Sequence, residues 1–338
     1  MNAPMEGRQQ ATPAGADGRL DLPWLVADVG GTNARFGWVD DPAAGVQHVQ
    51  QLAVADHAGP AQAAAAYLAG LRVTQAPRRA ALAVATALDG DRVAFTNSPW
   101  SFSRQQLQAD MGLQELRVLN DFEALALSLP RLGAQQIRPH GPAPRAQGTL
   151  AVIGPGTGLG VAGVVQTAAG WQALAGEGGH ATLAPTDDFQ AALLQQVRRT
   201  FEHVSAERLL SGIGLPTLHQ AVAEVTGRPA GARTAQEIVE AAVAGTDAVC
   251  VQAIEAFCAL LGSFAGNVAL TLGARGGVYI GGGIVPRLGE LFFASRFRAS
   301  FEAKGRFRSY LQAIPTALIT DTQVALTGAA AALEQPRL

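Results

Sequence analysis

Residues 24–39 read WLVADVGGTNARFGWV: an apolar run, a glycine-rich turn at 30–33 and a second apolar run. Two apolar runs around such a turn predict a β-hairpin. Glycine accepts the positive φ that a nest of backbone N–H groups requires, so this turn can hold a phosphate. Asp28 interrupts the first run near its end, and its carboxylate suits a hydrated Mg²⁺. For one such turn alone, an ordinary tight hairpin is the favoured interpretation.

The same order of events returns at 149–165, TLAVIGPGTGLGVAGVV. The chain therefore holds two copies of one unit, and we expect two Gly-Thr turns to close on one polyphosphate from opposite sides. Residues 158–163 also satisfy G-x-G-x-x-G. A dinucleotide-binding fingerprint needs a helix directly behind it, whereas 161–165 has the pattern of a strand, so a dehydrogenase is disfavoured.

Between and after these turns, apolar periodicity predicts strands alternating with helices, which indicates an α/β fold. Strands are expected at 79–84, 116–119, 277–280 and 318–320. Helices are expected at 61–71, 103–111, 122–129, 189–201, 206–210, 216–225, 234–244, 248–272 and 323–333.

The chain has 338 residues, 48% of them hydrophobic, and a formal net charge of -2 with only 15% charged residues. No long-range field exists to gather nucleic acid or an anionic membrane surface. Arginines interleave with phenylalanines over 296–308, but an amphipathic helix accounts for that pattern better than a nucleic-acid surface. The only lysine, Lys304, precedes Gly305, so no P-loop motif is present.

Cys250 and Cys258 lie eight residues apart, which excludes a zinc ribbon and a disulfide scaffold. We expect both to be buried in a reducing compartment. Residues 1–22 lack a signal-peptide core, and no uninterrupted apolar run reaches the length of a membrane span. The sequence thus predicts a cytoplasmic protein with a loose tail over 1–22.

Asn120 and Asp121 fall between a predicted strand and a predicted helix. Both residue types are common helix caps, so a structural role is one interpretation. A carboxylate at a strand end, beside a helix N-terminus, is also well placed to accept a proton from an alcohol. Transfer of a phosphoryl group to a hydroxyl needs one such base, and Asp121 fits that role.

The loop at 176–180, GEGGH, places Glu177 and His180 three residues apart among glycines. Glu207 follows at an expected helix start, where an acid that stabilises the helix dipole is the structural alternative. Together with Asn120 and Asp121, these groups offer the acceptors and donors that a neutral sugar demands. A metal site is the weaker interpretation, because the six histidines show no ligand spacing.

These motifs resemble the bacterial glucokinases of the actin-like ATPase superfamily, in the group without the ROK cysteine signature. The resemblance runs from about residue 25 to 333. It rests on ADVGGTNAR at 27–35, NDF at 120–122, GTGLG at 156–160, GEGGH at 176–180, HVSAER at 203–208 and GGIVP at 282–286.

The resemblance implies an α/β fold of two ribonuclease H-like domains around a central cleft. It places a small domain at 23–130 with the C-terminal helix at 322–338, and a large domain at 131–321. The implied reaction is ATP-dependent phosphorylation of glucose at its 6-hydroxyl, the first step of glycolysis, with ATP and Mg²⁺ required. A homodimer is also implied.

Asp121 would then be the catalytic base. The resemblance assigns the sugar to Asn97, Asn120, Asp121, Glu177, His180 and Glu207. It assigns the nucleotide to Ala27, Asp28, Val29, Gly30, Gly31, Thr32, Asn33, Gly156, Thr157, Gly158, Gly282 and Gly283. Asp28 would engage Mg²⁺ through water.

Two alternatives stay open at this point. A sugar-binding regulator of the same fold would use the cleft without turnover, although 22 residues before the first strand cannot supply a helix-turn-helix. A kinase for another hexose differs only in how individual hydroxyls are held. An actin-like chaperone would need a peptide-binding domain for which the chain has no room.

Overall fold

The computed structural model describes residues 21–335 except 72, 74, 96–97 and 146. The hairpin predicted at 24–39 is confirmed, with Val29 paired to Ala34 next to the turn. It belongs to a five-stranded sheet of order β3-β2-β1-β4-β7. Strands β4 and β7 run parallel to β1, whereas β2 and β3 are antiparallel neighbours. The strands are β1 (Trp24–Val29), β2 (Asn33–Val39), β3 (Gln47–Ala53), β4 (Arg79–Val84) and β7 (Glu115–Asn120).

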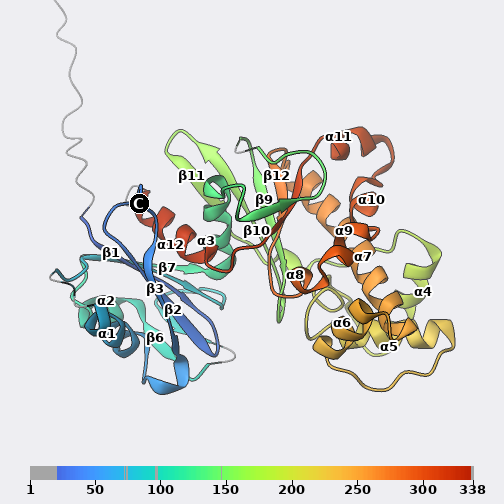
Figure 1. The fold of residues 1–338 in the computed structure, drawn as a ribbon, viewed down its shortest axis with the longest axis horizontal. Helices are drawn as coiled ribbons and strands as arrows, with labels where there is room; N and C mark the ends of the chain where they lie inside the picture. The colour runs from blue at the N-terminus through green and yellow to red at the C-terminus, as the bar shows by residue number, and fades with distance from the viewer. Residues whose placement is uncertain (1–20, 72, 74, 96–97, 146, 336–338) are drawn as a thin grey trace, which may run out of the picture.

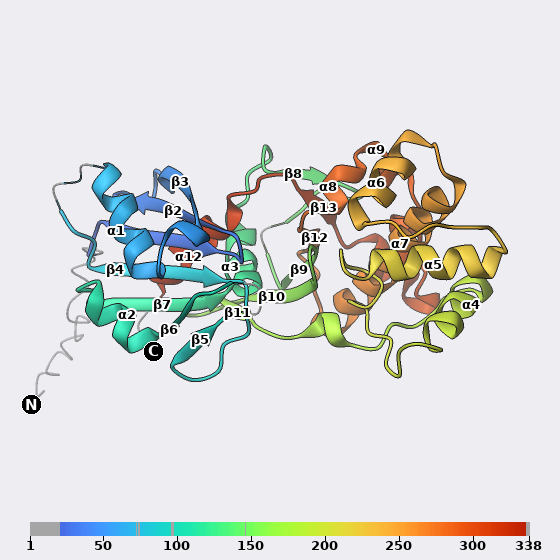
Figure 2. The ribbon, with the colours of Figure 1, turned by 90° about the horizontal axis from the view of Figure 1, so that it is seen from below.

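A second sheet, whose strands are labelled in Figure 2, repeats this plan in the order β11-β10-β9-β12-β13-β8. Its first five strands have the same directions as those of the first sheet, and β8 is added at the far edge. The predicted repeat and the ribonuclease H-like arrangement are therefore confirmed. The strands are β8 (Ile137–Pro139), β9 (Leu150–Pro155), β10 (Leu159–Thr167), β11 (Gly170–Leu174), β12 (Gly277–Ile280) and β13 (Thr316–Ile319). A small hairpin joins β5 (Arg92–Ala94) to β6 (Ser101–Ser103).

The helices follow the expected apolar periodicity. They are α1 (Pro60–Leu71), α2 (Arg104–Asp110), α3 (Asp121–Ser128), α4 (Asp188–Val197), α5 (Leu215–Thr226), α6 (Ala235–Ala244), α7 (Ala248–Leu272), α8 (Val285–Leu288), α9 (Glu290–Ala294), α10 (Phe297–Glu302), α11 (Arg308–Gln312) and α12 (Val324–Glu334). Short 3₁₀ turns are η1 (Val54–Asp56), η2 (Leu129–Arg131), η3 (Gly178–His180) and η4 (Gly305–Phe307).

Two helix predictions are wrong. Residues 206–210 form bends and turns, because backbone groups around them bond to other segments: Glu207 N donates to Gly179 O and Gly212 N donates to Gly156 O, in place of carbonyls four residues back. The single amphipathic helix expected over 296–308 is instead α10, η4 and the start of α11. Helix α10 ends at Glu302, because Ala303 leaves the helical region with a φ of -74° and a ψ of 63°.

Helices α3 and α12 lie between the two sheets (Figures 1 and 2). Helix α12 packs on the first sheet and on α3, and α3 packs on both sheets. Their shared core takes Leu119 from the first sheet and Val152 from the second. The helices approach so closely that a Cβ at Gly328 would lie 1.6 Å from the carbonyl oxygen of Ala124. The apolar cluster around α3 and α12 thus joins the two sheets. The domain limits given above stay a prediction.

Helix α7 is the one helix in the described part of the chain with the length and hydropathy of a membrane span. Of its most apolar window, 78% is buried within the fold. Packing against α5, α6 and α10 accounts for that composition, since a helix that is apolar all round is typical of a protein core. Cys250 and Cys258 lie on it, free and buried as expected.

Candidate active site

The turns of both hairpins open into one cavity of about 780 Å³. The predicted residues that line it are Gly31, Thr32, Asn120, Asp121, Gly156, Thr157, Gly158, Glu177, His180, Glu207 and Gly282. They come from six separate segments of the chain, which the two sheets bring to one place. The expected convergence of the two Gly-Thr turns is therefore present in the structure.

The turn of the first hairpin does not use positive φ. Neither Gly30 nor Gly31 is among the glycines with positive φ, and the same holds for the glycines of the second turn. The prediction of a left-handed nest is thus wrong. The first turn is closed instead by a hydrogen bond from Gly30 N to Asn33 O, at 2.9 Å. Thr32 O accepts from Val54 N, which ties the turn to η1.

Space favours glycine at Gly158 in the second turn and at Gly282 beside it, whereas the space around Gly156 is open. A Cβ at Gly158 would lie 2.5 Å from Oε2 of Glu207, and one at Gly282 would lie 2.3 Å from Pro155 O. Gly282 does have positive φ, at +76°. The loop before α5 supports the turn from outside, because Gly212 N donates to Gly156 O at 2.7 Å. Both the 212 and the 282 segments therefore lie directly against this turn.

Asp121 is the first residue of α3, and Asn120 is its N-cap. The Asn120 side chain accepts from Phe122 N at 2.9 Å and donates to Thr86 O at 3.2 Å. The capping interpretation is therefore correct for Asn120, which nevertheless lines the cavity. One N–H of its amide is left for a ligand. Asp121 Oδ1 accepts from Phe122 N at 3.0 Å, so the backbone orients the carboxylate.

Burial, followed by the charge of Asp28, raises the pKa of Asp121 to about 6. Hydrogen bonds from the backbone N–H groups of Phe122 and Asp121 oppose that rise. Burial also raises the pKa of Asp28, although Arg35 lowers it from 3.5 Å away. Two neighbouring carboxyl groups with raised pKa values mark a functional site, and a base with a pKa near 6 is ionised at neutral pH yet still basic.

The loop at 176–180 lies against β10. A Cβ at Gly179 would lie 2.0 Å from Leu159 O, so only glycine allows this approach. Gly179 O accepts from Glu207 N at 2.8 Å, which holds the two segments together. Glu207 Oε2 accepts from Leu159 N at 2.9 Å, while Oε1 lies 4.0 Å from Nδ1 of His180. Glu207 thus supports the second turn and also faces the cavity.

Some predicted residues do not line the cavity. They are Ala27, Asp28, Val29, Gly30, Asn33 and Gly283. The β1 residues among them lie behind the turn. Asn97 falls outside the described residues.

Other residues that line the cavity were missed by sequence reasoning. They are Ala85, Thr86, Ala87, Phe95, Phe122, Gly154, Leu159, Gly160, Val161 and Gly176. The segment 85–87 follows β4 at its carboxyl end, and ligands of open α/β sheets bind at such ends, so that signal was available. Phe122 had no signal apart from its position next to Asp121.

Comparison with known proteins gives matches over nearly the whole chain. The family model Glucokinase matches residues 25–336. The glucokinase of Aromatoleum aromaticum is 50% identical over 92% of this chain and 95% of its own length. The glucokinase of Paramagnetospirillum magneticum is 48% identical over 93% and 98%.

Solved structures agree. A glucokinase from an Antarctic psychrotroph superposes with a TM-score of 0.87 at 38% identity, covering 92% of this chain and 98% of that one. A ROK family glucokinase from Streptomyces griseus shares the fold at a TM-score of 0.61 and 21% identity, covering 91% and 98%. A family match over residues 25–336, close relatives and a shared fold together place the chain in the glucokinase family, the enzymes that phosphorylate glucose with ATP.

Proposed function

We propose that the cavity binds glucose and ATP together and that the γ-phosphoryl group passes to the sugar's 6-hydroxyl. The observation that carries this proposal is that Asp121 and both Gly-Thr turns line one cavity. Asp121 accepts the hydroxyl proton as the sugar oxygen bonds to the γ-phosphorus. The bond from that phosphorus to the bridging oxygen breaks, and ADP and glucose 6-phosphate result. Water is excluded by closure of the cleft, since water would otherwise compete with the alcohol.

The sugar's other hydroxyls bind to side chains at one end of the cavity. Glu177 and His180 are exposed there and have room for a ligand. Glu207 contributes Oε1, because Oε2 is already hydrogen-bonded to Leu159 N. Asn120 donates its free N–H. Asn97 stays a candidate from the sequence.

Phosphate oxygens accept from backbone N–H groups of the two turns, Gly31 to Thr32 on one side and Gly156 to Gly158 on the other. Adenosine lies beside Gly282 and Gly283, which follow β12, and Gly282 rests on the second turn. The residues Ala27, Val29, Gly30 and Asn33 act from behind by fixing the shape of the first hairpin.

Asp28 fits a role in holding Mg²⁺ through water. Its carboxylate is partly buried and lies close enough to Asp121 to raise the pKa of Asp121. The ion pair with Arg35 is long, because Nη1 of Arg35 lies 3.5 Å from Oδ2 of Asp28. Hard oxygen donors of this kind suit Mg²⁺, which retains several waters. When bound, Mg²⁺ neutralises charge on the polyphosphate. Arg35 orients the Asp28 carboxylate along the strand pair.

We also propose that the enzyme is cytoplasmic and homodimeric, as the resemblance implies. Analytical ultracentrifugation of the full chain measures the second point directly: a sedimenting mass of one chain would contradict it.

The test is ADP release with ATP and Mg²⁺, without sugar and with glucose, mannose, fructose or glucosamine. Glucose is expected to give the highest kcat/KM; a higher value for mannose, fructose or glucosamine would indicate a kinase for that sugar.

In Asp121→Asn we expect kcat to fall by about two to four decades while glucose still binds, because a general base is lost. Glu123→Gln is the matched control, a carboxylate on the same helix turn outside the cavity lining. A near-normal rate in Asp121→Asn removes that residue from the mechanism.

A further inference from the structure

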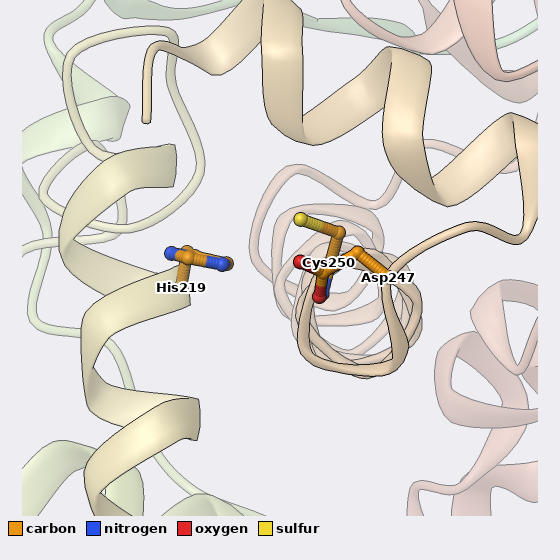
Figure 3. Close-up of side chains that lie close together, drawn as sticks. All are labelled: His219, Asp247 and Cys250. Carbon is orange, nitrogen blue, oxygen red and sulfur yellow. The ribbon is translucent and has the colours of Figure 1, made fainter. Parts of the chain in front are cut away.

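A second cluster of chemically active side chains lies in the helical part of the chain, away from the cavity. His219 projects from α5 toward the start of α7, where it meets Asp247 and Cys250 (Figure 3). One imidazole nitrogen, one carboxylate oxygen and the thiol sulfur lie within 4.8 Å of one another. None of the three lines the cavity assigned to the substrates.

The imidazole of His219 has a nitrogen without a hydrogen-bond partner. The residue is 2% exposed, and its Nε2 atom is buried without a hydrogen-bond partner. A buried polar atom that lacks a partner costs roughly 1–3 kcal/mol, so such atoms are rare unless something unseen satisfies them. The imidazole lies beside a thiol and a carboxylate, which are metal-ligating groups.

The carboxylate of Asp247 is already oriented. Its Oδ1 accepts from Val249 N at 2.9 Å and from Cys250 N at 3.0 Å, as the N-cap of α7. Its Oδ2 accepts from Arg233 Nη2 at 2.9 Å. The Arg233 side chain is 37% exposed, so it can turn into solvent and free that oxygen. Hydrogen bonds that fix a ligand's direction are typical around metal ions in proteins.

We propose that His219, Asp247 and Cys250 form a binding site for a transition-metal dication of the Zn²⁺ type. Imidazole, thiolate and carboxylate are the donors that Zn²⁺ takes in proteins, and water completes a four-coordinate shell. Metal–ligand bonds of about 2.0–2.3 Å place the donors roughly 3.5 Å apart, so the cluster contracts by about 1 Å. The Cys250 thiol releases its proton to solvent, and Arg233 leaves Oδ2 as the metal enters.

Occupation of this site would tie α5 to α7. Helix α5 begins directly after the loop whose Gly212 N donates to Gly156 O in the second turn. A metal at His219 therefore braces the helix that supports one wall of the active site. We expect it to raise the melting temperature, because a ligand that binds only the folded state stabilises that state.

To test the site, the untagged, metal-free full chain is titrated with Co²⁺. Co²⁺ substitutes for Zn²⁺ in such sites and, unlike Zn²⁺, absorbs visible light. One equivalent should give a thiolate-to-cobalt charge-transfer band and the visible bands of tetrahedral cobalt. Zn²⁺ should abolish both and raise the melting temperature, whereas Mg²⁺ should do neither. Absence of the thiolate band from folded wild-type protein would overturn the proposal.

Variants separate this site from adventitious binding. Cys250→Ser should lose the charge-transfer band, while Cys258→Ser, the other buried cysteine of α7, should keep it. Arg233→Met should bind Co²⁺ more tightly, because the competing guanidinium is gone. His219→Gln should lose the tetrahedral bands. A band that persists in Cys250→Ser with the wild-type circular dichroism spectrum also overturns the proposal.

Discussion

The ring of Phe122 fills the space in which Gly160 would carry a side chain: a Cβ there would lie 2.0 Å from two ring carbons. Gly154, the partner of Gly160 across the β9–β10 pair, leaves the same gap, at 2.3 Å from the ring. The ring of Phe122 thus packs directly on the backbone of two paired glycines. Because Phe122 follows Asp121 directly, this contact fixes where the proposed base lies relative to the second turn.

Gly160→Ala is expected to lower the free energy of unfolding by about 1–3 kcal/mol, because the ring must leave its position to admit a methyl group. We also expect kcat to fall, since Asp121 moves with the ring. Thermal unfolding and steady-state kinetics measure the two effects. Gly156→Ala, in the same hairpin with open space around its Cβ, is the control for stability. In Phe122→Ala the added methyl at 160 should cost less, and equal costs in both backgrounds would contradict the contact.

The pH dependence follows from the pKa of Asp121, which is about 6 in the folded protein. The base must be ionised to accept a proton, so kcat/KM should fall about tenfold per pH unit below that value. The raised pKa also means that the folded state holds the proton more tightly than the unfolded chain. Stability from this group is therefore full below pH 4 and lost as the pH rises to about 6. Asp121→Asn should have a higher melting temperature than wild type at pH 8, with the difference vanishing near pH 4. A lower melting temperature than wild type at pH 8 would contradict the raised pKa of Asp121.

Glu207 has a structural as well as a proposed sugar-binding role, and two variants separate these roles. Glu207→Ala leaves Leu159 N without its acceptor, which should cost about 1–3 kcal/mol and raise the KM for ATP through the second turn. Glu207→Gln keeps a carbonyl oxygen for that N–H, so stability and the KM for ATP should recover. A KM for ATP that is unchanged in Glu207→Ala would show that the turn does not depend on this bond.

A charged cluster holds α12 on the first sheet. Glu115 pairs with Arg79 at 2.6 Å and with Arg117 at 2.7 Å, and both arginines donate to carbonyl oxygens at the end of α12. Burial raises the pKa of Glu115, but the hydrogen bonds from the two arginines outweigh it and lower that pKa overall. Glu115→Gln removes the buried carboxylate charge that both arginines share, so we expect a loss of about 3–5 kcal/mol on denaturant unfolding.

The control for Glu115→Gln is Glu334→Gln. Glu334 pairs with Arg131 at 2.6 Å, but both side chains are substantially exposed, so its loss should cost about 1 kcal/mol or less. Because the pKa of Glu115 is lowered in the folded state, its contribution is present above the unfolded pKa. This contribution to stability disappears as the pH falls through the pKa of Glu115 in the folded protein. The stabilities of Glu115→Gln and Glu334→Gln should therefore converge in acid. Equal losses at neutral pH would contradict the role of the buried cluster.

Local signals were enough for most of the secondary structure. The hairpins and long helices were predictable because apolar periodicity and glycine turns act within a few residues of sequence. The turns at 206–210 were mistaken for helix because the apolar periodicity did not register Gly212 and Gly214, which carry the backbone toward Gly156. Positive φ was expected in the hairpins, but there the glycines serve close approach to Phe122, Glu207 and neighbouring backbone.

The sequence alone determined that two copies of a strand, Gly-Thr turn and strand unit exist, with Asp121 at a helix start and an acidic, glycine-rich loop. Each of those features depends on neighbours within one turn or hairpin. The tertiary structure decided that Phe122 positions Asp121 against β9 and β10, that Glu207 supports the second turn, and that His219 meets Cys250. Those contacts join residues about 30 to 50 positions apart, and only the packing of helices and loops on two sheets brings their side chains together.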